Sequence, residues 1–376
     1  MNTVYLDHAA TTPVLDVVKS AMPQILEYYG NPSSAHIEGT KVKEKIINAR
    51  KFLAREFNIS DEGVLFTSGG TEANNQIINS FINGSGKILI SSIEHPSVKN
   101  PASLAKDNLI NIPYKNGEID YEFLCEKLDK ETINLVSVMS VNNETGLKND
   151  CGKIGRLIKE ISPNTKFHVD AVQNFAKEKI NIRRDLIDFL SFSSHKFGGL
   201  KGSGGIISSH NLKKTLIPLI YGGGQEMGMR SGTENLVSIE STRIALEYWI
   251  NNRSKIHRNN EKIGKIIKES IKEENGFTPL WDNNGEFANW IYSFAVVGIQ
   301  TPEVIVRSLA ESGICISSGS ACHTGKIVEN SVMKNLGYKE EAAAMLRISL
   351  GWNSEINHIE IFLEKFKEVL ESIVKK

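Results

Sequence analysis

Short runs of β-branched and aromatic residues recur through the first half of the chain, and this pattern constrains the fold most strongly. The runs are Val64–Phe66, Ile88–Ile90, Leu135–Val138, Phe167–Val169, Phe189–Phe192 and Ile206–Ile207. Amphipathic stretches such as Ile154–Ile161 separate several of them and are long enough for the crossovers that parallel strands need. This alternation predicts an α/β fold whose mostly parallel central sheet is flanked by helices.

The pattern changes after about residue 250, where a helical stretch rich in lysine and glutamate (Glu261–Glu274) begins. Strands are expected around Trp290–Val297 and Ile314–Ser317. The chain closes with a helix whose apolar face, typical of core packing, carries Ile356, Ile359, Leu363, Phe366 and Leu370. Because 376 residues exceed what one core usually holds, we predict a large domain over 14–252 and a smaller α+β domain formed by 1–13 and 253–376.

Charge and cysteine usage narrow the class of protein. Acidic and basic residues balance at 44 each, so no net field would hold the chain on nucleic acid or an anionic membrane. No signal peptide pattern opens the sequence, and no apolar run reaches the roughly 20 residues of a membrane span. The four cysteines show no CxxC pair and no metal-ligand spacing: Cys125, Cys151, Cys315 and Cys322. We therefore expect a cytoplasmic protein with free thiols and no metal site.

Polar side chains follow five of the predicted strands. The segments are Thr67–Glu72, Glu94–Pro96, Asn142–Gly146, Asp170–Gln173 and Ser193–Lys196. Ligands of open α/β sheets bind beyond the carboxyl ends of the strands, so five such endings predict one shared site.

One end of this site is suited to a phosphate. Gly70 and Thr71 open a predicted helix, where free backbone N–H groups and the helix dipole favour an anion, and Ser193 and His195 add side-chain donors. The same Gly-Thr segment is also typical of an ordinary turn and helix N-cap.

The other end is suited to an aldehyde cofactor with a pyridine ring. A strand-end lysine can form a Schiff base. Asp170 can keep a pyridinium nitrogen protonated, His95 can stack on the ring, and Gln173 can donate to a phenolic oxygen. Taken singly, an aspartate such as Asp170 is more often a capping or ion-pair residue than a cofactor ligand, and a lone histidine such as His95 is most often a hydrogen-bonded structural residue.

Two lysines compete for the Schiff-base role. Lys196 is closer to its strand than Lys201, and this spacing favours Lys196 modestly. The glycines around Lys201 are also typical of a plain surface loop.

Ten segments together resemble the cysteine desulfurases of the NifS/IscS-like group, within the class V aminotransferases of fold-type-I pyridoxal-phosphate enzymes. They are YLDHAATTP (5–13), NPSSAH (31–36), FTSGGTEANN (66–75), EHPSV (94–98), VNNETG (141–146), HVDAVQ (168–173), SFSSHKFGGLKG (191–202), GGGQEMGMRSGT (222–233), SSGSAC (317–322) and LRISLG (346–351). The resemblance runs almost from end to end.

The resemblance implies pyridoxal 5'-phosphate as cofactor and a role for each matching residue. Lys196 would be the Schiff-base lysine, with Asp170 on the pyridine nitrogen, Gln173 on the phenolic oxygen and His95 on the ring face. Gly70, Thr71, Ser193 and His195 would hold the phosphate. Thr233 would reach the phosphate of a neighbouring subunit, which implies a homodimer. Asn143 would lie beside the cofactor and orient the substrate, and the Arg347 fork would bind the substrate carboxylate.

Cys322 lies among small residues and glycines, so on its own it is a loop cysteine of no stated role. Within the SSGSAC motif the resemblance implies that it takes sulfur from L-cysteine as a persulfide, leaving L-alanine. The sulfur would pass to an acceptor protein of iron–sulfur cluster assembly or of tRNA thiolation. His95 and His323 are alternative proton acceptors for the thiol, and the sequence does not choose between them.

Two segments depart from the family pattern. Leu147–Cys151 lacks the usual apolar and proline-containing continuation, and 323–331 lacks the usual Glu-Pro-Ser spacing, which leaves the acceptor open. Two other functions compete. One is a different pyridoxal-phosphate enzyme such as an aminotransferase or selenocysteine lyase, and the other is a catalytically silent scaffold.

Overall fold

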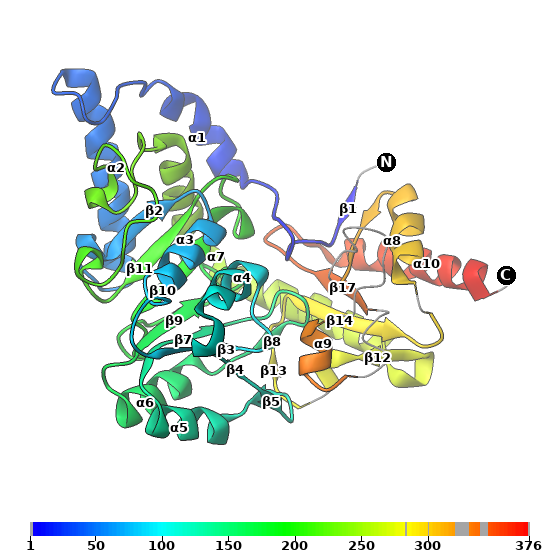
Figure 1. Cartoon of the computed structure of the whole chain (residues 1–376). Helices are drawn as coiled ribbons and strands as arrows, with labels where there is room; N and C mark the ends of the chain where they lie inside the picture. Colours follow the sequence, from blue (N-terminus) through cyan, green and yellow to red (C-terminus); the bar gives the residue numbers. More distant parts are fainter. Residues whose placement is uncertain (1–2, 283, 300, 320–330, 339–344, 375–376) are drawn as a thin grey trace.

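The computed structural model describes residues 3–282, 284–299, 301–319, 331–338 and 345–374, so Cys322 lies outside the described residues. A seven-stranded sheet lies at the centre of the larger part of the molecule (Figure 1). In spatial order its strands are β2 (Val64–Thr67), β11 (Gly204–Ser208), β10 (Phe189–Ser193), β9 (Lys166–Asp170), β7 (Ile133–Met139), β3 (Lys87–Ser91) and β4 (Leu109–Ile112).

The predicted mostly parallel sheet is confirmed, with one strand reversed. β11 runs antiparallel to both of its neighbours, β10 and β2, and the other pairs are parallel. Only residues 194–203 join β10 to β11, too few for the crossover that a parallel pair requires. The sequence pattern gave no direction for the single strand at Ile206–Ile207, and edge strand β4 was not predicted.

Helices cover both faces of this sheet, which explains why its strands are nearly continuous apolar runs. Val64 and Phe66 face one hydrophobic cluster, whereas Leu65 between them faces another. The first cluster includes residues of α1 (Asp16–Leu26), α2 (Ile37–Glu56), α5 (Tyr121–Lys130), α6 (Cys151–Ile161) and α7 (Leu236–Ser270). The second includes residues of α3 (Gly70–Asn79) and α4 (Pro96–Ala102).

Helix α7 is far longer than the sequence pattern indicated. It has 35 residues, starts at the Asn235 cap, whose side chain accepts from the Ser238 amide, and stops at Ser270. The helix predicted over Glu261–Glu274 is thus only the last part of α7, and α7 ends four residues before the predicted end. Apolar residues such as Leu246 and Trp249 are buried in the first cluster, and Ile263 and Ile267 in a different one, so the helix joins two cores.

The C-terminal part is built on a four-stranded antiparallel sheet. Its strands, in spatial order, are β12 (Phe277–Pro279), β14 (Ile291–Val296), β17 (Met345–Ser349) and β16 (Ser317–Ser318). The helices around it are α8 (Pro302–Glu311), α9 (Ser331–Asn335) and α10 (Ile356–Val374). The single strand expected over Ile314–Ser317 is two strands in two different sheets, because β15 (Ile314–Cys315) leaves this sheet and pairs elsewhere.

The first residues pack against the C-terminal part (Figure 1). β1 (Val4–Tyr5) pairs in parallel with β15, and Val4, Leu6 and Ala9 share a hydrophobic cluster with residues of α10 such as Ile359. These contacts support our proposal of two domains, 14–252 and 1–13 with 253–376, which α7 links by running through residue 252.

The departing segment Leu147–Cys151 has a local structural role. β8 (Leu147–Lys148) pairs with β13 (Glu286–Phe287), and the Lys148 ammonium lies 2.6 Å from Glu286 and 2.9 Å from Glu178. Asp150 then caps α6 by accepting from the Lys153 amide. The remaining hairpin is β5 (Tyr114–Lys115) with β6 (Glu118–Ile119). In the parts of the chain that the structure describes, no helix has the length and apolarity needed to span a membrane.

Candidate active site

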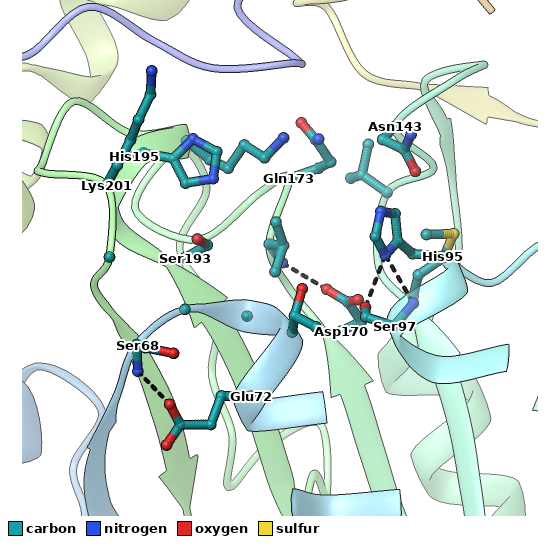
Figure 2. Close-up of a pocket in the computed structure, with 18 residues that line it drawn as sticks. Ser68, Glu72, His95, Ser97, Asn143, Asp170, Gln173, Ser193, His195 and Lys201 are labelled. Atoms are coloured by element: carbon teal, nitrogen blue, oxygen red, sulfur yellow. Dashed lines mark hydrogen bonds between the residues drawn. The ribbon is translucent and has the colours of Figure 1, made fainter. Parts of the chain in front are cut away.

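Five parallel strand ends meet at one cavity of about 440 Å³ (Figure 2). β11 runs antiparallel to both of its neighbours, β10 and β2. β2 therefore points the same way as β10, β9, β7 and β3. The residues predicted from these ends that line the cavity are Gly70, Thr71, His95, Asn143, Asp170, Gln173, Ser193, His195 and Lys196. The sheet therefore brings together the side chains that the sequence had placed at separate strand ends.

The start of α3 forms one wall of the cavity. Gly70 permits a close approach there, since a Cβ on it would lie 2.6 Å from a methyl group of Val172. The first amides of this ten-residue helix have no partner within the helix, and Thr71 and the Ser193 hydroxyl lie beside them. This wall is suited to a phosphate group.

An acidic residue near this wall is already engaged. Glu72 accepts from the Ser68 amide at 2.8 Å (Figure 2) and lies 3.1 Å from the Arg230 guanidinium. These interactions hold the pKa of Glu72 below its usual value although burial opposes them. A negative ligand at the helix start would thus meet a carboxylate whose charge Arg230 compensates.

His195 completes this end of the cavity in a neutral form. Its Nδ1 lies 3.0 Å from the Thr11 hydroxyl. Burial, followed by the nearby Lys196 charge, lowers the pKa of His195 to about 4. At neutral pH the ring therefore acts as a hydrogen-bonding group and adds no charge.

Asp170 lies at the floor of the cavity and is buried. One carboxylate oxygen accepts from the Val172 amide at 2.9 Å, and the other accepts from the Asn74 side chain at 2.8 Å. His95 lies across from it, with Nδ1 held by the Ser97 amide and hydroxyl (Figure 2). These contacts fix the orientations of the Asp170 carboxylate and the His95 ring in the cavity.

Lys196 follows β10 in a short 3₁₀ turn (Ser194–Lys196). Its ammonium donates to the carbonyl oxygens of Ala9 and Ala10, at 2.7 and 2.8 Å. Burial, then the charge of Arg347, lowers the pKa of Lys196 to about 8. A substantial fraction of this amine is neutral near pH 8 and can act as a nucleophile.

The competing lysine has a different environment. Lys201 also lines the cavity, but its side chain is exposed and points away from Asp170 and His95 (Figure 2). Position and burial therefore favour Lys196 as the reactive amine.

Gln173 is buried against the first residues of the chain. Its Nε2 donates to the Ala9 carbonyl at 2.9 Å, and its Oε1 is buried with no partner among the described residues. One of its two amide hydrogens thus stays available for a ligand in the cavity.

Arg347 lies on β17, next to the cavity and close enough for its charge to affect Lys196. It is 5% exposed, pairs with Asp7 at 2.7 Å, and donates to the Asn143 carbonyl at 2.8 Å. Its Nε has no partner among the described residues. Arg347 is outside the set of residues that line the cavity itself, so it approaches the site from the small-domain side.

Among the described residues, Thr233 is a predicted site residue that is exposed and does not line the cavity. Cys322 lies outside the described residues. Four contributors were missed by the sequence analysis: Asp7, the Ala9–Ala10 carbonyls, Asn74 and Ser97. Their only signal was membership of the segments 5–13, 66–75 and 94–98, which carry the family resemblance.

A family description decides where this site belongs. The model of the class V aminotransferases matches residues 4–362. The chain belongs to the class V aminotransferase family. Within this family it belongs to the cysteine desulfurases of the NifS/IscS-like group, as its relatives show. It is 36% identical to a cysteine desulfurase IscS of Buchnera aphidicola subsp. Baizongia pistaciae, over 93% of this chain and 88% of that protein. It is 32% identical to cysteine desulfurase IscS 1 of Archaeoglobus fulgidus, over 98% and 97%.

Solved structures of similar proteins confirm the fold of this chain. A NifS-like protein from Rickettsia africae superposes with a TM-score of 0.89 at 32% identity, covering 98% of this chain and all of that one. A protein named SspA, solved in complex with cysteine, has a TM-score of 0.79 at 30% identity, covering 93% and 99%.

The cofactor of this class V aminotransferase family member is pyridoxal 5'-phosphate, and the cavity fits it. The α3 start, Ser193 and His195 form a phosphate cradle at one end. Asp170 supplies a buried carboxylate for the ring nitrogen, and Lys196 supplies an amine of lowered pKa for the aldehyde. When bound, this cofactor acts as an electron sink for a bonding pair released at the substrate Cα.

Proposed function

We propose that this cysteine desulfurase transfers the sulfur of L-cysteine to Cys322 as a persulfide and releases L-alanine. The convergence of Lys196, Asp170 and His95 on one cavity, with Arg347 beside it, carries the proposal. The relatives named cysteine desulfurase and the related structure that contains cysteine support the choice of substrate.

Substrate binding is assigned to Arg347 and Asn143. The guanidinium presents a planar pair of N–H donors that matches a carboxylate. The Asn143 carbonyl accepts a hydrogen bond from Arg347, so the two residues lie side by side. A substrate held there has its amino group on the side of Lys196.

Proton transfer at the substrate Cα is assigned to Lys196. Its lowered pKa of about 8 suits an amine that must be neutral to accept a proton near neutrality. The carbonyl oxygens of Ala9 and Ala10 supply a resting position for the amine when it is charged.

Sulfur transfer is assigned to Cys322. Its thiolate attacks the substrate sulfur: an S–S bond forms, the substrate Cβ–S bond breaks, and the electron pair of that bond remains on the carbon fragment. Protonation of this fragment gives alanine. The preceding segment supports the assignment, because Ser317 pairs with Arg347 and the Gly319 amide donates to the Met345 carbonyl. Cys322 follows Gly319 by three residues, which span at most about 11 Å.

The partners and location are further parts of the proposal. We propose a cytoplasmic homodimer in which Thr233 reaches the phosphate site of the partner subunit. The exposure of Thr233 supports a protein contact at this residue. The IscS names of the relatives support an iron–sulfur scaffold as acceptor, with a tRNA-thiolation enzyme as the alternative.

The direct experiment is to incubate the purified enzyme with L-cysteine and a thiol reductant and to measure alanine and sulfide. Equal amounts of both are expected, and Cys322→Ser should reduce both strongly. A Cys322→Ser enzyme that forms alanine from L-cysteine at the normal rate would favour a selenocysteine lyase or aminotransferase. A purified protein that lacks the absorbance of the bound cofactor would favour a silent scaffold.

A further inference from the structure

A chain of buried hydrogen bonds runs beneath the cavity from His168 to His95. Its distances are 2.8 Å from Ser137 Oγ to His168 Nδ1, 3.1 Å from His168 Nε2 to Ser191 Oγ, and 2.5 Å from Ser191 Oγ to Asn74 Oδ1. Asn74 Nδ2 continues it to Asp170 and, at 2.9 Å, to Ser97 Oγ, which lies 2.8 Å from His95 Nδ1.

The direction of every hydrogen bond in this chain follows from Asp170. The Asn74 amide must turn its NH₂ group to the Asp170 carboxylate, because the reverse orientation would set two acceptors against each other. Asn74 Nδ2 therefore spends one hydrogen on Asp170 and the other on Ser97. Its Oδ1 accepts from the Ser191 hydroxyl.

The far end of the chain is consistent with this direction. Ser191 donates to Asn74, so it accepts from His168 Nε2, and His168 Nδ1 accepts from Ser137. Burial lowers the pKa of His168 to about 3, so this histidine is neutral with its hydrogen on Nε2. Each hydrogen-bond donor in this part of the chain then faces an acceptor.

The near end determines the state of His95. Ser97 Oγ accepts from Asn74 and must give its own hydrogen to His95 Nδ1. The Ser97 amide also donates to Nδ1, at 3.1 Å. A hydrogen on Nδ1 would face two donors, so the hydrogen of neutral His95 lies on Nε2, which points away from Ser97 (Figure 2).

The charges around His95 do not reverse this result. Asp170 and Glu144 raise its pKa, Lys196 and Lys99 lower it, and packing of the ring, the largest effect, lowers it below its ordinary value. The ring is thus neutral near neutral pH.

We infer that Asn74 and Ser97 are positioning residues that lock His95 as a neutral hydrogen-bond donor toward the cavity. With Nε2 protonated and Nδ1 occupied, His95 has no free lone pair for a proton from Cys322 or from the substrate thiol. The Nε2–H group of His95 instead donates a hydrogen bond to the ligand that occupies the cavity. The conclusion that His95 is not the base for the Cys322 thiol rests on the proposed function, in which that thiolate attacks the substrate sulfur.

The test is the ring-nitrogen NMR spectrum of histidine-labelled enzyme with bound pyridoxal phosphate and without L-cysteine. His95→Gln identifies the His95 signals. We expect the Nε2–H tautomer of His95 from pH 6.5 to 8.5. A His95 ring with its hydrogen on Nδ1, or charged at pH 7.5, would overturn it. Because no substrate is present, a failure of sulfur transfer would leave this spectrum readable.

Variants of the relay sharpen the test. Ser97→Ala removes one donor to Nδ1 but leaves the Asn74–Asp170 bond, so we expect a rise in the His95 pKa and a roughly tenfold loss in kcat, the size of one hydrogen bond. Ser97→Thr keeps a hydroxyl and should restore both. Ser103→Ala, which removes an exposed hydroxyl bonded to the Asn100 carbonyl, is the matched control. An unchanged His95 spectrum and pKa in Ser97→Ala would refute the role of the hydroxyl.

Discussion

The edge of the seven-stranded sheet and the Arg347 region contribute to one site, but they are built differently. At the sheet edge, five parallel strands deliver their next residues to one cavity, and buried hydrogen bonds fix Asp170 and His95. Arg347 instead contacts Asp7, which is 340 residues away in the sequence, and Asn143, which is 204 residues away. Its Nε has no hydrogen-bond partner among the described residues. The first region is prearranged by backbone topology, whereas the second depends on how two domains and the first residues meet.

This difference suggests a division of labour. A cofactor that stays bound benefits from the rigid sheet edge, where the groups that hold it are preorganised. A substrate that enters and a sulfur that leaves are served by groups on the small-domain side. Substitutions at the sheet edge should therefore mainly affect kcat, and substitutions around Arg347 should mainly affect KM.

The largest effect is expected for Lys196→Ala. Removing the amine that accepts the Cα proton should reduce alanine formation roughly 10²–10⁴-fold, the usual contribution of a general base. Lys201→Ala serves as the comparison, because this lysine lines the same cavity but points away from Asp170. Steady-state alanine assays measure both, and an equal loss in the two variants would contradict the choice of Lys196.

The second effect concerns the substrate carboxylate. Arg347→Ala should raise the KM for L-cysteine roughly 10²-fold, since two charge-assisted hydrogen bonds are lost. Arg347→Lys should recover little of this loss, because a lysine cannot form the planar pair. If the KM stayed normal and only kcat fell, Arg347 would belong functionally with the sheet edge.

A smaller effect is expected at Asp7. Asp7→Asn keeps the shape but removes the charge that lies 2.7 Å from Arg347. The guanidinium should lose its orientation, and the KM should rise about tenfold. Asp16→Asn, an exposed residue of α1 with an ion pair to Lys19, is the matched control. A KM that falls in Asp7→Asn would show instead that Asp7 competes with the substrate.

The smallest effect is a pH dependence. Burial and the Arg347 charge lower the pKa of Lys196 to about 8, so its neutral fraction rises as the pH passes through 8. The rate at which the apoenzyme takes up pyridoxal phosphate should therefore increase between pH 7 and 9 and then level off. In Arg347→Ala the midpoint should move upward, because one of the lowering charges is gone. A wild-type midpoint near 10.5, the ordinary lysine value, would contradict the coupling.

The sequence predicted the sheet edge well for a physical reason. Residues after parallel strands share one edge, so strand runs and their following polar residues were enough to bring Asp170, His95 and Lys196 together. The pattern missed the reversal of β11, because Ile206–Ile207 is equally apolar in either direction and only the short connection decides. It also missed Asn74 and Ser97, whose roles arise from contacts 96 and 23 residues away.

The Arg347 region was less predictable from sequence. Asp7 follows a two-residue strand whose parallel partner, β15, is more than 300 residues away, and no local periodicity encodes that pairing. The length of α7 was underestimated because its buried residues belong to two cores in turn, which interrupts a single apolar stripe.

The central claim is that the sheet edge releases sulfur from L-cysteine to Cys322. The most direct measurement is mass spectrometry of the peptide that contains Cys322 after one equivalent of L-cysteine is added to the enzyme without reductant. We expect the added mass of one sulfur atom on Cys322, formed together with one alanine, and no added sulfur on the peptides with Cys125, Cys151 or Cys315. Alanine formed with no sulfur on Cys322, or with the sulfur on another cysteine, would contradict it.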